Sequence, residues 1–289
     1  MTWALVRRLV CRYKPKLFHT NTMTGYPNAT GHDNGEAEQM PLFETSVLFI
    51  LLLAYEQLTG DTAYARQYGP LLRGYAEWLY NDNSLYPSSQ LISVDSVAGQ
   101  PNQTGLAIQS AIGLKAASAL LGDSKYADLA STNVKEIYDN ALGLDGDTLE
   151  SSSHFTYYYG KPASWNVLFP AWSDVFLNLT TLPQEAYDLQ SSWYGQSISE
   201  QGLAWSDSTD WGLLDWNIVV AAVSSDEVQK SIVETSHTFL TNGKTDVPFG
   251  TRYFVKGPRA GEWLSNKARP TVGSNFAILA LKEGVIYGS

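Results

Sequence analysis

The stretch LTGDTAYA (residues 58–65) returns about 62 positions later as LLGDSKYA (residues 120–127). In each copy an apolar segment ends at a glycine, which adopts the left-handed backbone of a helix C-cap without steric cost. The aspartate that follows is suited to cap the next helix. A third copy, TLPQEAY (residues 181–187), has a proline where the helix restarts. The repeat predicts hairpins of two antiparallel helices, each of roughly 20 residues.

Hydrophobic residues on either side of these connections recur with helical spacing. Ala107 to Leu121 is apolar all round, as in an inner helix, whereas Tyr126 to Leu142 is more polar, as in an outer one. Alternating inner and outer helices build an all-α (α/α)6 six-hairpin toroid. Nine or ten helices are expected, too few to close a ring of twelve. The remaining helices are predicted over 42–58, 71–79, 165–179, 185–193, 211–223, 226–240 and 270–283.

The composition describes a globular chain with an acidic surface. Its 289 residues are 44% hydrophobic, and 19 Lys and Arg stand against 29 Asp and Glu, for a formal net charge of −10. An acidic field repels phosphate backbones and anionic lipids, so we expect neither nucleic acid nor membrane as a partner. The longest apolar run, Val47 to Ala54, is far shorter than the roughly 20 residues of a membrane span. The single cysteine, Cys11, cannot form an internal disulfide.

The first 24 residues form a basic, atypical segment without the apolar core and cleavage site of a signal peptide. Glycosylation sequons nevertheless begin at Asn28, Asn102 and Asn178, which weakly indicates secretion. A chain that has lost its native start accounts for both observations. We therefore expect residues 1–24 to lie outside the domain, and residues 25–289 to form it.

Long loops, rich in polar and aromatic residues, alternate with the short connections and are expected to share one face, where we place the site. The first leads to Glu44, near the start of a helix. Glu44 is either an acid that complements the helix dipole or a site acid that faces the toroid axis. In the same loop, His32 and Asp33 are either a base with its orienting partner or turn residues.

A second loop carries Asp95 and Asn102. Asp95 lies in a stretch too polar to be core, which leaves a site acid and a turn former as equal alternatives. Asn102 or Thr104 is suited to cap the helix that follows, and Asn102 is also suited to contact a ligand.

Tryptophans stand beside acids or amides in two further loops, at Trp165-Asn166 and at Asp210-Trp211, with Trp205 nearby. Such pairs either line pockets for neutral polar molecules or pack in the core, with Thr209 or Asp210 capping a helix. The last loop holds Arg252 and Arg269, and an arginine here either clamps a substrate carboxylate or pairs with a loop acid.

Other chemistries lack their motifs. No Gly-rich phosphate loop, G-x-S-x-G elbow, CxxC or HExxH is present, and the four histidines lie far apart in the sequence. We expect no metal and no cofactor. Hydrolysis by two carboxyls remains, one to activate water and one to protonate the leaving group.

Taken together, these stretches resemble the six-hairpin domain of the fungal glutaminase A family, collinearly from about Gly25 to Gly284. The resemblance implies an (α/α)6 toroid, an extracellular, secreted glycoprotein, and hydrolysis of L-glutamine to L-glutamate and ammonia. It rests on HDNG (32–35), MP (40–41) with Glu44, LTGD (58–61), Asp95 with AG (98–99), NQT (102–104), YG (159–160), SW (164–165), DW (210–211), PF (248–249), ARP (268–270) and VG (272–273).

The chain departs from the family pattern at three places. Phe43 and Ser96 each stand where many relatives have a second acid, so the chain would bind without turnover if the lost acid were the catalytic one. The amino-terminal β-rich domains and first helices of the family are not recognisable before about Gly25. We therefore expect a truncated member, with the missing domains of the parent protein as potential partners.

We interpret the sequence as that of an amidohydrolase that acts on L-glutamine or a related small amide. Glu44 and Asp95 form the acid and base pair. The substrate-binding residues are His32, Asp33, Asn102, Trp165, Asp210, Trp211 and, as carboxylate clamp, Arg269. Two alternatives stay open: a glycoside hydrolase with sugar stacked on Trp165, Trp205 or Trp211, and an inactive binding module.

Overall fold

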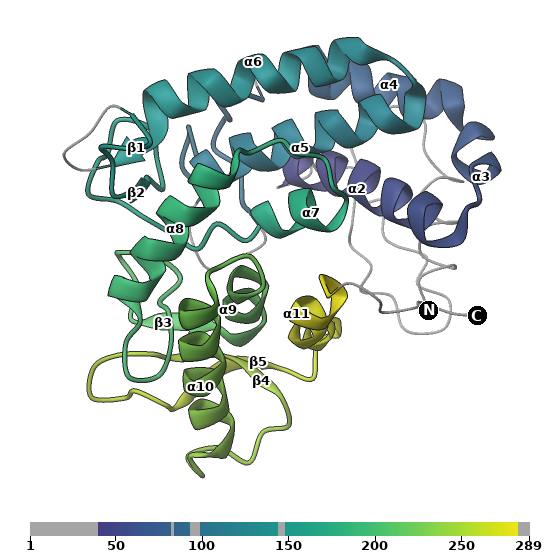
Figure 1. Cartoon of the computed structure of the whole chain (residues 1–289). Helices are drawn as coiled ribbons and strands as arrows, with labels where there is room; N and C mark the ends of the chain where they lie inside the picture. The colour runs from purple at the N-terminus through teal and green to yellow at the C-terminus, as the bar shows by residue number, and fades with distance from the viewer. Residues whose placement is uncertain (1–39, 82–83, 93–98, 144–147, 283–289) are drawn as a thin grey trace. The chain divides into compact units, whose positions relative to one another are not determined.

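The computed structural model describes residues 40–81, 84–92, 99–143 and 148–282 (Figure 1). These ranges contain ten α-helices, one 3-10 helix and five short strands. The chain divides into two compact units, an amino-terminal unit, Met1–Val134, and a carboxy-terminal unit, Lys135–Ser289.

The predicted connection is confirmed in the amino-terminal unit. Helix α2 (Pro41–Thr59) ends at Gly60, which has the left-handed φ of 71°, and α5 (Thr104–Leu121) ends in the same way at Gly122. The Asp61 carboxylate accepts hydrogen bonds from the backbone N–H groups of Ala63 and Tyr64 at 3.0 and 3.2 Å. It thereby opens α3 (Ala63–Arg66), which is followed by α4 (Gly69–Asn81).

The core of this unit lies between α2 and α5, which run side by side (Figure 1). Thirteen of the 18 residues of α5 are buried, as expected for a helix that is apolar all round. Helix α6 (Ser124–Ala141) instead buries one stripe that includes Tyr126, Ala130 and Ile137. Among the described helices, α2 and α5 are long and apolar enough to span a membrane, but 44% and 72% of their apolar windows are buried inside the protein, as in core helices.

A glycine sets the closest approach of these two helices. A Cβ atom added to Gly113 of α5 would lie 2.6 Å from the Cβ of Ser46 on α2. We expect Gly113→Ala to lower the free energy of unfolding by about 1–3 kcal/mol, because the helices must separate. Gly74 on α4 is the matched control, since its added Cβ meets nothing within 4 Å. Gly74→Ala should stabilise by up to about 1 kcal/mol in the same urea titration. Equal effects of the two substitutions would contradict the packing.

The carboxy-terminal unit combines short helices with two small sheets. Strand β1 (Leu142–Gly143) pairs antiparallel with β2 (His154–Phe155). Strands β3 (Trp211–Leu213), β4 (Gly250–Phe254) and β5 (Trp263–Lys267) form an antiparallel sheet in the order β3-β4-β5. The helices are α7 (Ala171–Phe176), α8 (Gln184–Ser197), α9 (Leu214–Ala221), α10 (Asp226–Thr241), the 3-10 helix η1 (Pro270–Phe276) and α11 (Ala277–Ala280).

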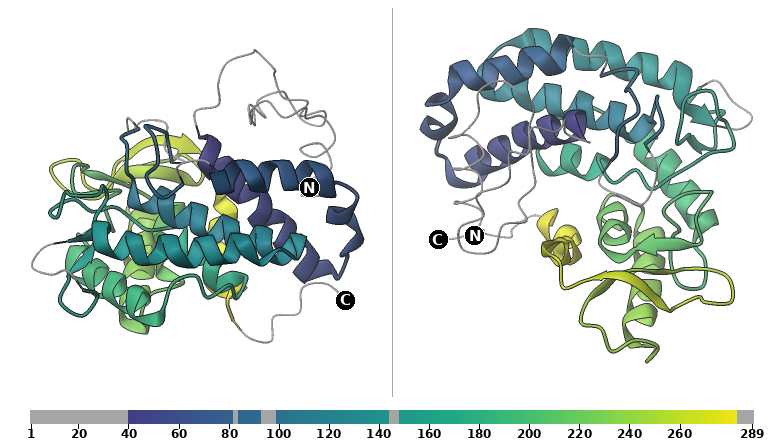
Figure 2. Two further views of the ribbon diagram at one scale, coloured as in Figure 1. Left: turned by 90° about the horizontal axis from the view of Figure 1, so that it is seen from above. Right: turned by 180° about the vertical axis from the view of Figure 1, so that it is seen from behind.

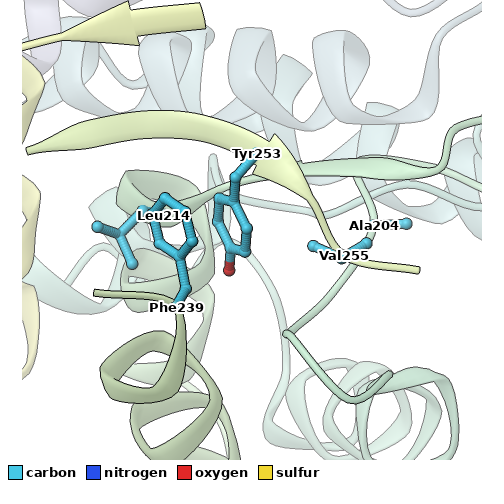
Figure 3. Close-up of a cluster of buried hydrophobic side chains, with 5 residues drawn as sticks. All are labelled: Ala204, Leu214, Phe239, Tyr253 and Val255. Carbon is cyan, nitrogen blue, oxygen red and sulfur yellow. The ribbon is translucent and has the colours of Figure 1, made fainter. Parts of the chain in front are cut away.

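One face of the three-stranded sheet packs on α9 and α10. The rings of Tyr253 on β4 and Phe239 on α10 stack with centroids 3.7 Å apart, next to Leu214 (Figure 3). Figure 2 shows the β4–β5 hairpin crossing beside these two helices. Side chains alternate between the two faces along a strand. Arg252 and Phe254, which flank Tyr253, therefore lie on the opposite face, together with Trp211.

The strands were not predicted. The helix expected over 211–223 begins only at Leu214, because its first three residues pair with β4. The helix expected over 165–179 is limited to 171–176, because Asn166 forms a β-bridge with Ser206. The sequence signal for β4 was present in the β-branched and aromatic run Thr251 to Val255, but it lay inside a segment interpreted as a loop.

The third connection, between α7 and α8, works without a glycine. Buried Asp174 in α7 accepts hydrogen bonds from the backbone N–H groups of Thr181 and Leu182, at 2.8 and 2.9 Å. It also accepts one from the Tyr187 hydroxyl at 2.8 Å. A carboxylate on the preceding helix thus holds the connection before Pro183, the N-cap of α8.

Candidate functional site

Of the proposed acid and base pair, only Glu44 lies within the residues that the structure describes. Glu44 is half-buried in the first turn of α2, which begins at Pro41 and has no side-chain cap on its N-cap residue, Met40. Asp95 lies outside the described residues, as do His32 and Asp33. Their roles stay predictions.

Asn102 does not cap the helix that follows. Gln103 occupies the N-cap position without a side-chain cap bond, and Thr104 is the first helical residue. Asn102 itself is half-exposed with a positive φ of 59°, a conformation that asparagine tolerates better than most residues, and its N–H donates to Pro87 O at 2.8 Å. The expectation that Asn102 or Thr104 is the cap residue was therefore wrong.

Buried Gln90 connects the starts of α2 and α5. Its Oε1 accepts from Leu42 N at 3.0 Å, and its backbone O accepts from Gln103 Nε2 at 2.6 Å. The backbone of Gln90 approaches Gly99 so closely that an added Cβ would lie 2.5 Å from its carbonyl oxygen. The segment 99–103, which leads into α5, thereby contacts Gln90, and Gln90 in turn holds the start of α2, the helix that carries Glu44.

In the carboxy-terminal unit, the structure joins the two predicted tryptophan loops. Trp165 N donates to Asp207 Oδ1 at 3.0 Å, and Asp207 N donates to Trp165 O at 3.0 Å. Trp165 also meets Trp193 edge to face, with ring centroids 6.2 Å apart. Sequence reasoning had not selected Asp207 or Trp193.

The ring of buried His154 stacks on the ring of Trp193, with centroids 4.0 Å apart. Its Nε2 lies 3.0 Å from Ser164 O, which can only accept, so Nε2 carries the hydrogen and Nδ1 accepts from the Ser153 hydroxyl at 2.9 Å. Burial lowers the pKa of His154, and the hydrogen bond to Ser164 offsets only part of that shift.

This environment predicts a loss of stability in mild acid. Because the pKa of His154 is lower in the folded than in the unfolded chain, the unfolded chain takes up the proton first as the pH falls below about 6.5. The free energy of unfolding should therefore fall with pH by at most about 1.4 kcal/mol per unit in this range. Urea titrations at pH 5 to 8 should show a shallower slope for His154→Gln, but not for a His237→Gln control at an exposed histidine. Parallel slopes for His154→Gln and the unchanged protein would contradict this.

Trp211 and Asp210 stand at the start of the sheet rather than at a helix terminus. The Asp210 side chain is exposed, and its backbone O accepts from Val255 N at 2.9 Å. The Thr209 hydroxyl donates to the carbonyl groups of Ser206 and Trp211. Leu213 is the N-cap of α9, so neither Thr209 nor Asp210 caps a helix as expected. Trp205 is only 1% exposed, and Trp211 only 9%.

Sequence reasoning missed a buried carboxyl, Asp215, in the first turn of α9 and 4% exposed. Burial raises the pKa of Asp215. The Thr271 hydroxyl, a backbone N–H of Trp216 and the charge of Arg269 act in the opposite direction. Trp216 N donates to Asp215 Oδ1 at 3.2 Å, whereas Thr271 lies nearby without a regular hydrogen bond. The signal was a single acid within the run 211–223, which is apolar apart from Asp215 and Asn217.

The two arginines of the last loop differ in their surroundings. Arg269 is exposed just before η1, and its charge lowers the pKa of Asp215 in α9, but no ion pair joins it to an acid of the described residues, so neither predicted alternative for Arg269 is decided. Arg252 on β4 is half-buried, and its guanidinium carbon lies 3.8 Å from the centroid of the Trp211 ring. A face of Trp211 that would stack on a ligand is therefore occupied by an arginine.

These groups offer acid–base chemistry and recognition of an anion. Asp215 has the environment of a carboxyl that keeps its proton at higher pH than an exposed one. Arg252 offers a planar cation on a rigid aromatic base. Both belong to neighbouring elements, since Leu213 on β3 pairs with Arg252 and is followed by α9.

Comparison with known proteins gives two similar fungal relatives. One is Glutaminase A of Aspergillus oryzae, 30% identical over 263 residues that cover 89% of this chain and 38% of that protein. The other is a probable glutaminase of Arthroderma benhamiae, 24% identical over 234 residues that cover 69% of this chain and 26% of that protein. The chain thus spans well under half the length of these curated relatives.

A solved structure, described as a possible member of the GH105 family from Salmonella enterica, covers 97% of this chain and 92% of its own, with 11% identity and a TM-score of 0.47. The family model for the glutaminase A six helical-hairpin domain matches residues 10–279. This match confirms the fold class and the resemblance found in the sequence. The chain therefore belongs to the glutaminase A family and contains its six helical-hairpin domain.

Proposed function

We propose that this chain hydrolyses the side-chain amide of L-glutamine to L-glutamate and ammonia. The observation that carries the proposal is the similarity to Glutaminase A of Aspergillus oryzae, which extends over 89% of the chain. Because the chain covers only 38% of that relative, the proposal includes the claim that the hairpin domain holds the catalytic carboxyls.

Amide hydrolysis requires two proton transfers. A base takes a proton from water as the oxygen attacks the amide carbon, and an acid gives a proton to the nitrogen as the carbon–nitrogen bond breaks. Glu44 and Asp95 are the proposed pair. Trp165, Asp210 and Trp211 are proposed to shape the pocket, and His32, Asp33 and Asn102 to contact the substrate.

Asp215 is the rival candidate for the acid. A proton donor must hold its proton near the working pH, and burial raises the pKa of Asp215 in that direction. Its buried position in the first turn of α9, near Arg269 and Thr271, is typical of tuned carboxyls in active sites. Comparing the activities of Glu44→Gln and Asp215→Asn therefore shows which of the two carboxyls is the acid.

The arrangement of the tryptophans favours an amide over a sugar. Sugar binding uses an open aromatic face, but Trp205 is buried and Arg252 lies over Trp211. Of the three rings expected to stack on a sugar, Trp165 is half-buried and the other two are buried.

The test is ammonia release by the purified 289-residue protein. We expect release from L-glutamine, less from L-asparagine, whose side chain is one methylene shorter, and no cleavage of nitrophenyl glycosides. Cleavage of a glycoside without ammonia release would replace the proposal with the glycosidase alternative. Silence on all substrates from a folded protein would favour an inactive binding module.

A further inference from the structure

We infer that Arg252, supported by Trp211, binds the α-carboxylate of the amino acid substrate. The inference deepens the proposed function and rests on it for the identity of the substrate. It assigns to Arg252 the clamp role that sequence reasoning gave to Arg269.

Arg252 has no carboxylate partner in the part of the chain that the structure describes. Within residues 40–81, 84–92, 99–143 and 148–282, no acidic side chain lies within ion-pair distance of its guanidinium, and its buried Nε has no hydrogen-bond partner. A half-buried guanidinium carries five N–H donors that have lost part of their water. Leaving the buried Nε–H group unpaired is costly, which favours a site that binds an anion.

Arg259, in the connection between β4 and β5, provides a comparison with an arginine that has a carboxylate partner. Arg259 also lies over an aromatic ring, 4.2 Å from the centroid of Phe254, but its Nε donates to Glu262 Oε2 at 2.9 Å. Both arginines stack on β-sheet aromatics, and only Arg259 is paired with a carboxylate of the described chain. The difference singles out Arg252 as available to a ligand.

The geometry suits a carboxylate. Trp211 covers one face of the guanidinium, whose central carbon lies 3.8 Å from the ring centroid, so a planar, bidentate partner would approach along the edge, where the donors lie. Arg252 sits in a paired strand between Leu213 and Ser265, which fixes its backbone. Arg269, by contrast, is exposed, and no aromatic ring of the described residues supports its guanidinium.

The decisive experiment compares L-glutamine with 4-aminobutanamide, which is glutamine with hydrogen in place of the α-carboxylate. In the unchanged protein, kcat/KM should be higher for L-glutamine. In Arg252→Gln this preference should fall roughly 30- to 100-fold, mostly through KM, because a charge-assisted bidentate contact is lost. Arg252→Lys should be intermediate, since lysine keeps the charge but not the fork. Arg259→Gln is the matched control and should keep the preference.

A binding measurement separates this inference from the proposed function. L-glutamate carries the same α-carboxylate, and its calorimetric titration requires no turnover. We expect binding to the unchanged protein and to Arg259→Gln, and at least about tenfold weaker binding to Arg252→Gln and Arg252→Lys. If ammonia release fails but this pattern appears, the activity is wrong and the carboxylate site stands. Equal binding by the Arg252 and Arg259 variants, or no binding by the unchanged protein, overturns the inference.

Discussion

Ammonia release from L-glutamine is expected to fall at least about 100-fold in Asp95→Asn and in Glu44→Gln, the loss typical of removing a general base or acid. Both substitutions keep the size of the side chain, so circular dichroism and urea midpoints should match those of the unchanged protein. KM should change little, because the loss is in the chemical step.

Two further variants show whether Glu44 or Asp215 is the acid. Glu56→Gln alters another acid of α2, in its last turn, and should leave turnover unchanged. If Glu44→Gln retains more than about a third of the activity while Asp215→Asn loses about 100-fold, Asp215 is the acid instead. Near-normal kcat in both Asp95→Asn and Glu44→Gln would remove the proposed pair.

The largest effect on stability is expected at Asp174. Asp174→Ala removes the acceptor of two backbone N–H groups and of the Tyr187 hydroxyl, all in a site where Asp174 is 2% exposed. Unpaired buried donors cost about 1–3 kcal/mol each, so the free energy of unfolding should fall by about 3 kcal/mol or more. Urea-induced unfolding followed by circular dichroism measures the change.

Two companion variants make the result specific. Asp174→Asn keeps one oxygen acceptor and should lose less stability than Asp174→Ala. Asp188→Ala removes an exposed acid that accepts a hydrogen bond from Gln184, one helical turn earlier, and should change the free energy of unfolding by no more than about 0.5 kcal/mol. A loss of less than about 1 kcal/mol in Asp174→Ala would show that the connection does not depend on this carboxylate.

The hairpin connections were predictable because their physics is local. A glycine in the left-handed region and an aspartate that caps the next turn act within a few residues, so 58–65 and 120–127 were interpreted correctly. The third connection is held by Asp174, seven residues before Thr181, and no local pattern indicates that contact. The strands could not be predicted for a related reason, because Trp211 pairs with Phe254, more than forty positions away.

The candidate site was predictable only as a set of residue types. Acids beside tryptophans indicated a polar pocket, but which acid is buried depends on tertiary packing. Asp215 became a candidate through its 4% exposure, whereas Asp210 is exposed. In the same way, the sequence favoured Arg269 as the clamp, whereas the half-burial of Arg252 and the ring of Trp211 against it became visible only in the fold.

Hydrolysis of L-glutamine by this domain is tested by measuring ammonia and L-glutamate in the same reaction with the purified protein. We expect equal amounts of both products from the unchanged chain and at least about 100-fold slower formation of both by Asp95→Asn. A folded protein that forms neither product would show that the domain is not a glutaminase, and an Asp95→Asn variant that forms both at the unchanged rate would exclude Asp95 from catalysis.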